Sequence, residues 1–91
     1  MRKIHVVITG RVQGVGFRAW CERAALTRQI VGWVRNRTDG SVEAVFCGDD
    51  DEIEDMLATC HRGPAAAAVS EVKVNRYEGE APTTFMVLPT A

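Results

Sequence analysis

The residues best suited to chemistry lie in one short run, Gly10-Arg-Val-Gln-Gly-Val-Gly-Phe-Arg18. The run joins an alternating apolar segment to a segment with helical spacing, so it predicts a loop between a strand and a helix. Backbone N–H groups at the start of a helix have no partner within the helix, and glycines let the chain turn them toward a ligand. The run therefore predicts a cradle for phosphate or another oxyanion.

Arg18 is the most informative residue of this run. An arginine in the first turn of a helix opposes the helix dipole, at a cost of about 0.3–1 kcal/mol. An anion held between Arg18 and the backbone N–H groups removes that conflict, because a guanidinium can bind two phosphate oxygens at once. The alternative is a glycine-rich turn with a solvated arginine, which the glycine motif alone does not exclude.

The glycine run partly resembles two nucleotide-binding motifs, but neither fits the sequence. Gly14-Val-Gly-Phe-Arg-Ala19 fits the letters of a dinucleotide fingerprint, with Asp39 about twenty residues further on. Asp39 falls in a predicted hairpin turn, however, and 91 residues leave no room for the second half of such a domain. No Lys-Ser or Lys-Thr follows the glycines, which argues against a nucleotide-hydrolase phosphate loop.

The elements that must position the cradle follow from apolar periodicity and turn residues. In chain order they are Lys3 to Thr9, a helix from Phe17 to near Arg28, Ile30 to Arg37, Ser41 to Cys47, a helix capped by Asp49 or Asp50 and stopped by Gly63-Pro64, Val69 to Tyr77, and Phe85 to Leu88. This order predicts one α+β domain over residues 1–91. We expect a ferredoxin-like βαββαβ sandwich, an antiparallel sheet with two helices on one face.

Composition and charge narrow the function. The chain is 46% hydrophobic and 25% charged, which is typical of a globular domain. Residues 1–37 carry eight Lys and Arg against one acid (+7), and residues 38–91 carry three against eleven (-8), which gives the net charge of -1. A split of this kind favours a local anion site over a nucleic-acid or membrane surface.

Cysteine usage and hydropathy suggest a compartment. Cys21, Cys47 and Cys60 are odd in number and form no C-x-x-C pair, and no signal peptide is recognisable. No apolar run approaches the roughly 20 residues that span a bilayer. We expect reduced thiols in a cytoplasmic protein.

The run from Gly10 to Arg18, followed by GWVRNRTDGSVE (Gly32 to Glu43), resembles the signature pair of the acylphosphatase family. A weaker resemblance covers nearly the whole chain, including the Gly63-Pro64 turn and Phe85. It implies hydrolysis of the carboxyl–phosphate bond of acyl phosphates to a carboxylate and inorganic phosphate, without metal or cofactor. The catalytic residues that it implies are Arg18 and Asn36. The phosphate-binding residues that it implies are Val12, Gln13, Gly14, Val15, Gly16, Phe17 and Arg18.

The implied chemistry suits what the sequence contains. A carboxylate leaving group is a weak base, with a pKa near ~4 for its conjugate acid, so it needs no general acid. Phosphoryl transfer then asks mainly for charge stabilisation, which Arg18 and the loop amides would supply, and for a positioned water, which Asn36 would orient. Taken alone, Asn36 is an ordinary polar residue before a turn; its place in the second block favours the catalytic role. The proton acceptor for the water and the physiological acyl group stay open.

Other candidate sites are weaker. The acids from Asp49 to Glu52 suit the positive end of a helix better than a metal site, and His5 and His61 have no partner at ligand spacing. Trp20 and Trp33 are expected at the core or its margin, although either is able to flank an acyl group.

A possible basic patch supports a second hypothesis, a non-enzymatic anion-binding or RNA-binding module. The patch comprises Arg2, Lys3, Arg11, Arg35 and Arg37. No RNP-like aromatic pattern accompanies it, so no nucleic-acid partner is expected. A third hypothesis is a carbamoyl-phosphate-handling domain of a larger maturation enzyme. Because the chain ends where the domain ends, a free-standing monomer that binds a small acyl phosphate, and phosphate or sulfate as inhibitors, is preferred.

The sequence departs from the family pattern after the first helix. Arg28 and Gln29 stand where a leucine and a helix-ending glycine are usual. A left-handed Gln29 would cost about 1 kcal/mol relative to glycine. We expect Leu26 to replace the missing packing.

Overall fold

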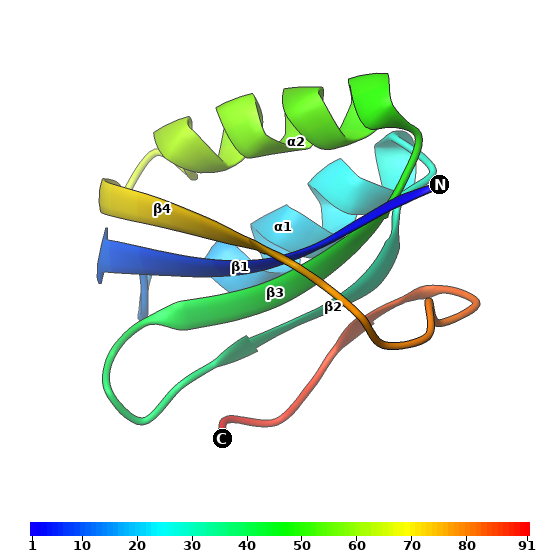
Figure 1. Cartoon of the computed structure of the whole chain (residues 1–91). Coiled ribbons are helices and arrows are strands. Elements are labelled where there is room, and N and C mark those ends of the chain that lie inside the picture. The colour runs from blue at the N-terminus through cyan, green and yellow to red at the C-terminus, as the bar shows by residue number, and fades with distance from the viewer.

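The computed structural model describes residues 1–91 as five strands and two helices (Figure 1). In chain order these are β1 (Arg2–Arg11), α1 (Phe17–Thr27), β2 (Val31–Asn36), β3 (Val42–Gly48), α2 (Asp50–Arg62), β4 (Ala68–Arg76) and β5 (Phe85–Val87). Every predicted element is present, and most boundaries differ by one or two residues. None of the helices is long and apolar enough to cross a membrane.

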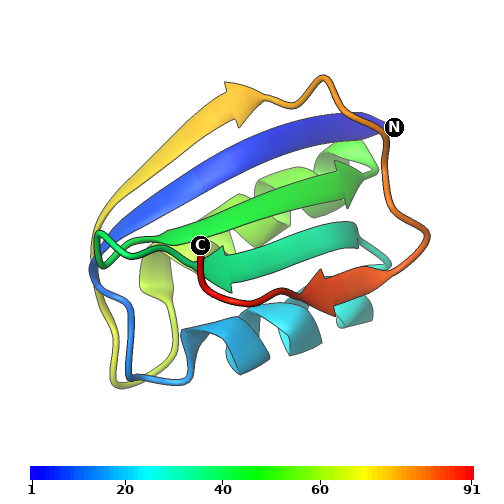
Figure 2. The ribbon, with the colours of Figure 1, turned by 90° about the horizontal axis from the view of Figure 1, so that it is seen from below.

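The sheet has the strand order β4-β1-β3-β2-β5, and both helices lie on the same face (Figures 1 and 2). α1 packs over β2 and β5, and α2 packs over β4, β3 and β1. These two layers confirm the predicted α+β sandwich and its ferredoxin-like fold.

One edge of the sheet corrects the expectation of a wholly antiparallel sheet, because β5 pairs in parallel with β2. Figure 2 shows the reason: the segment after β4 crosses one end of the sheet without running back along it. β5 therefore starts from the end where β2 starts, and the two strands run in the same direction.

The register brings the ends of β1 and β2 together. Both strands pair antiparallel with β3, so they run in the same direction. Val42 pairs with Ile8 of β1 on one side and with Asn36 of β2 on the other. The loop that follows β1 and the residue that ends β2 therefore share one end of the sheet.

The core lies between the sheet and the helices, as the periodicity predicts. Ile4, Val6 and Ile8 of β1 are buried, and the helices contribute Phe17, Cys21, Ala25, Ile53, Met56 and Cys60. Full burial of an Ile, Val, Phe or Met side chain stabilises a fold by about 1.5–3 kcal/mol. Because core residues lie near both ends of α1, the core holds the start of this helix in place beside the glycine loop.

The end of α1 shows how the chain accommodates the unusual pair Arg28 and Gln29. Gln29 adopts the predicted left-handed conformation, with φ 56°. Arg28 donates to Asp55 Oδ2 at 2.7 Å and to Thr59 Oγ1 at 3.1 Å, which connects α1 to α2. The expectation for Leu26 was wrong, because this residue is 53% exposed and is not part of the core. Arg28 supplies the contact between the helices instead.

The ends of α2 also follow the sequence, with one correction. Asp49 occupies the position before the helix, but its side chain makes no capping hydrogen bond. The carboxylates of residues 50–52 in the first turn still complement the positive end of the helix. The helix ends at Gly63, whose φ of 66° suits glycine.

Candidate active site

The glycine loop has the backbone conformation that the sequence predicts. Gly14 and Gly16 have φ angles of 74° and 76°, which residues other than glycine rarely adopt. A Cβ atom added at either position would meet no other atom within 4 Å. The positive φ angle, and not a lack of space, is therefore what favours glycine at these positions. The space in front of both residues is open to a ligand. Gly16 directly precedes α1, so the free N–H groups of the helix start at this loop.

A pocket of about 380 Å³ lies against this loop. Its lining residues are Val12, Gln13, Gly14, Gly16, Phe17, Arg18, Ala19, Glu22, Asn36 and Val87. Arg18 and Asn36, which are 18 positions apart in the sequence, thus face one space. Of the residues predicted to bind phosphate, only Val15 does not line the pocket; its side chain packs against the core.

Arg18 has no partner within the protein. It takes part in none of the side-chain hydrogen bonds or ion pairs, whereas Arg2, Arg28, Arg35 and Arg76 are all paired. The first turn of α1 contains no acid. The guanidinium and the positive end of the helix dipole therefore lie at the same point, an arrangement that an anion would relieve.

Gln13 connects the loop to the hairpin that follows Asn36. Its Nε2 donates to the backbone oxygen of Arg37 at 2.7 Å and to that of Ser41 at 2.8 Å. Asp39 shapes the same turn by accepting hydrogen bonds from Ser41 Oγ at 2.6 Å and Ser41 N at 2.9 Å. These bonds lower the pKa of Asp39. The side chain of Gln13 thus fixes how far the loop lies from the end of β2.

Three lining residues were missed by sequence reasoning: Ala19, Glu22 and Val87. Ala19 and Glu22 lie on α1, and the helical spacing of Glu22 from Arg18 was a usable signal, since residues four apart share a face. Val87 is on β5, whose parallel placement beside β2 no local pattern predicts. Neither tryptophan lines the pocket: Trp20 packs edge-on against Phe17, with ring centroids 5.2 Å apart, and Trp33 lies under Arg35.

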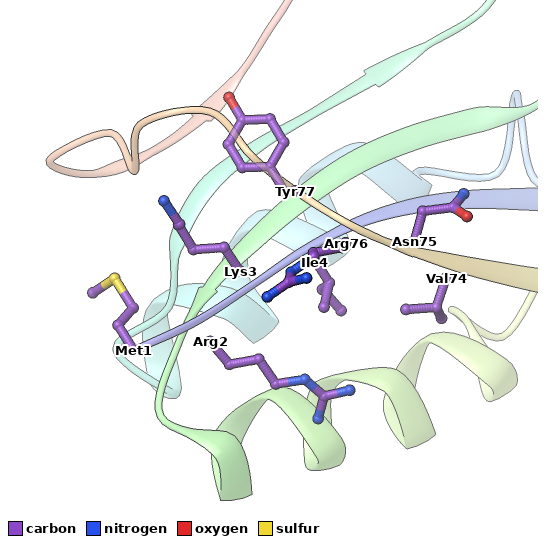
Figure 3. Close-up of a pocket in the computed structure, with 8 residues that line it drawn as sticks. All are labelled: Met1, Arg2, Lys3, Ile4, Val74, Asn75, Arg76 and Tyr77. Atoms are coloured by element: carbon purple, nitrogen blue, oxygen red, sulfur yellow. The ribbon is translucent and has the colours of Figure 1, made fainter.

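A second pocket, of about 450 Å³, lies at the opposite end of β1 (Figure 3). Its charged residues are already paired. Arg2 reaches toward α2 and bonds Glu54, which raises the pKa of Arg2. Lys3 donates to the backbone oxygen of Gly79 at 2.8 Å, and Arg76 lies 3.7 Å from Glu78. The pocket contains no glycine loop or helix start, so its larger size does not make it the better anion site.

The remaining candidates do not assemble into sites. The proposed basic patch is dispersed, because Arg2 and Arg11 lie at opposite ends of β1 and Arg35 is paired with Glu43 at 2.7 Å. His5 is also bonded to Glu43, at 2.6 Å. No three His, Cys, Asp or Glu side chains are arranged to hold a metal ion.

Comparison with known proteins identifies the family of the chain. Residues 4–87 match the sequence profile of the acylphosphatase family. The acylphosphatase of Nitrobacter hamburgensis is 57% identical over 68 residues, 75% of this chain and 69% of the relative. That of Bradyrhizobium diazoefficiens is 47% identical over an alignment of 96 positions, 96% of this chain and 94% of the relative.

A solved structure gives the same result. The crystal structure of acylphosphatase from Bacillus subtilis superposes with a TM-score of 0.92 at 30% identity, covering 97% of this chain and 99% of that one. The chain therefore belongs to the acylphosphatase family of enzymes, which hydrolyse acyl phosphates.

Proposed function

We propose that the protein cleaves the carboxyl–phosphate bond with Arg18 and the backbone amides of residues 12–18 holding the phosphate, and with Asn36 orienting the attacking water. One observation carries the proposal. Arg18 has no protein partner and lines the same pocket as Asn36 and the open glycine loop. A pocket with free donors on one wall and a carboxamide on another suits an anion and a water together.

Charge stabilisation comes from the start of α1. The free N–H groups of the loop point at the phosphate oxygens, and the guanidinium of Arg18 binds two of them. These donors are held in place by the fold before the substrate arrives. In a loose phosphoryl-transfer transition state, charge is spread over those oxygens, so fixed donors lower the barrier.

Bond making and breaking need little help from side chains. The water oxygen forms a bond to phosphorus as the bond between phosphorus and the bridging oxygen breaks, and the departing carboxylate keeps that electron pair. The carboxamide oxygen of Asn36 accepts a hydrogen bond from the water and aims it, and an oxygen of the phosphate takes the proton that the water loses. The products are a carboxylate and inorganic phosphate.

Further parts of the proposal concern conditions and partners. The reaction proceeds without metal or cofactor, in a cytoplasmic monomer that acts on small acyl phosphates. Inorganic phosphate or sulfate binds at residues 12–18 and inhibits competitively, with shifts of the amide signals of those residues. Noncompetitive inhibition with unmoved amide signals would contradict the cradle.

The test is phosphate release from benzoyl phosphate in the presence of a chelator. We expect turnover by the wild type, none with a phosphate monoester, and about a 10²-fold loss of kcat in Asn36→Ala with phosphate affinity retained, because the water is no longer positioned. Asn75→Ala is the matched control, since Asn75 is an exposed asparagine of β4 beside the other pocket. A folded wild-type protein that binds phosphate without turnover would favour an anion-binding module.

A further inference from the structure

The active-site pocket extends beyond the phosphate cradle. Its volume is about 380 Å³, whereas a water molecule occupies about 30 Å³ in the liquid and a phosphate group has only five heavy atoms. The remaining space is bounded by Ala19, Glu22 and Val87. Glu22 lies four residues after Arg18, which is about 6 Å along the helix axis. The extension therefore runs along α1, away from the cradle.

The apolar walls of this extension come from two elements. Phe85 and Val87 share one face of β5, because side chains alternate along a strand. Phe85 is buried in the core, so Val87 also faces the helix layer, yet it remains 41% exposed. Together with Ala19, it presents apolar surface next to the site of the phosphate.

Glu22 gives the extension its charge. It is the only acid that lines the pocket, and none of the ion pairs in the molecule involves it. Its side chain is half-buried, so its field is less screened than that of a fully exposed carboxylate. A second negative charge placed beside it would be repelled.

We propose that this extension is the subsite for the acyl group, and that Glu22 makes it select acyl groups that are neutral or positively charged over those carrying a further carboxylate. The inference rests on the proposed function, because the acyl group enters the extension only when the cradle holds the phosphate. It adds the substrate class that the phosphate chemistry leaves open. Like-charge contacts at a recognition surface exclude the wrong partner in this way.

The experiment compares benzoyl phosphates that differ in charge at the para position: carboxamide, carboxylate and aminomethyl. The first two have nearly the same shape, so their ratio of kcat/KM isolates one charge. In the wild type we expect kcat/KM to be about ten-fold higher for the carboxamide than for the carboxylate, as one partly screened unit charge predicts. For the aminomethyl compound, kcat/KM should exceed that of the carboxylate by at least the same factor. In Glu22→Gln the carboxamide-to-carboxylate ratio should fall to about one. Raised salt should also shrink the wild-type ratio.

Glu71→Gln is the matched control, because Glu71 is an exposed and unpaired acid of β4 on the opposite edge of the sheet. It should keep the wild-type ratio. Equal ratios in the wild type and Glu22→Gln would overturn the subsite.

A binding measurement separates this proposal from the proposed function. Acylmethylphosphonates with the same para substituents cannot be hydrolysed, and their dissociation constants should show the same preference and the same loss of it in Glu22→Gln. If there is no turnover but the dissociation constants still show the charge preference, only the hydrolytic function would be contradicted. Turnover of benzoyl phosphate without any preference, in rate or in binding, would contradict only the subsite.

Discussion

A pocket lined by arginine lies beside each end of strand β1, with a volume of about 380 Å³ at the cradle end and about 450 Å³ at the other. At the far end, Arg2 and Arg76 lie near acids and Lys3 is bonded to a carbonyl. At the cradle end, Arg18 is unpaired and stands at the start of a helix. The two ends thus differ in whether the arginine that lines the pocket is paired, and the proposed anion site lies at the end where it is not.

The largest expected effect tests this contrast directly. Arg18→Gln should lower kcat/KM for benzoyl phosphate by about 10²–10³-fold and weaken phosphate binding, because the site loses its only side-chain cation. Arg76→Gln is the control at the far end, and its kcat/KM should stay within about two-fold of the wild type, as expected for an exposed pair. Steady-state kinetics on both variants decides. A comparable loss in Arg76→Gln would mean that the two ends do not differ as the geometry indicates.

A smaller effect tests what holds the cradle end together. Gln13→Ala removes the two hydrogen bonds that fix the loop relative to the end of β2. We expect kcat to fall about ten-fold, with a lesser change in phosphate affinity, because the water and the phosphate are no longer held in register.

A double-mutant cycle with Asn36→Ala provides the control for Gln13. If Gln13 acts by positioning Asn36, then removing Gln13 from the Asn36→Ala protein should not lower kcat further. Additive losses in kcat would assign Gln13 a separate role.

The smallest effect belongs to the far end, where a backbone strain has no bearing on the chemistry. Gln29→Gly relieves the left-handed conformation at φ 56° and should raise the free energy of unfolding by about 0.5–1 kcal/mol. Urea unfolding measures the gain, and kcat should be unchanged. Gln29→Ala is the control, because alanine keeps the strain and should give no gain. A changed kcat in Gln29→Gly would show that the two ends are coupled.

The conformation of the glycine loop and the layered fold could be predicted because their signals are local. Glycines before a helix, an Asp-Gly turn and an apolar period each depend on neighbouring residues. The parallel pairing of β5, and with it Val87 in the pocket, depends on where a crossing segment places a short strand. The partners of Gln13 are carbonyls of a hairpin distant in the sequence, which side-chain type does not reveal. The sequence predicted the position of Asp49 before the helix, but it did not predict that the side chain makes no capping hydrogen bond.

The three thiols have a practical consequence. Cys21, Cys47 and Cys60 are free and fully buried, and the neighbouring Cys60 thiol together with burial raises the pKa of the Cys21 thiol. A thiol reagent therefore reacts only when the surrounding structure opens. Cys21 and Cys60 report on the helix layer and Cys47 on the sheet. The relative labelling rates of these cysteines in the native protein would thus show whether the helix layer or the sheet opens first.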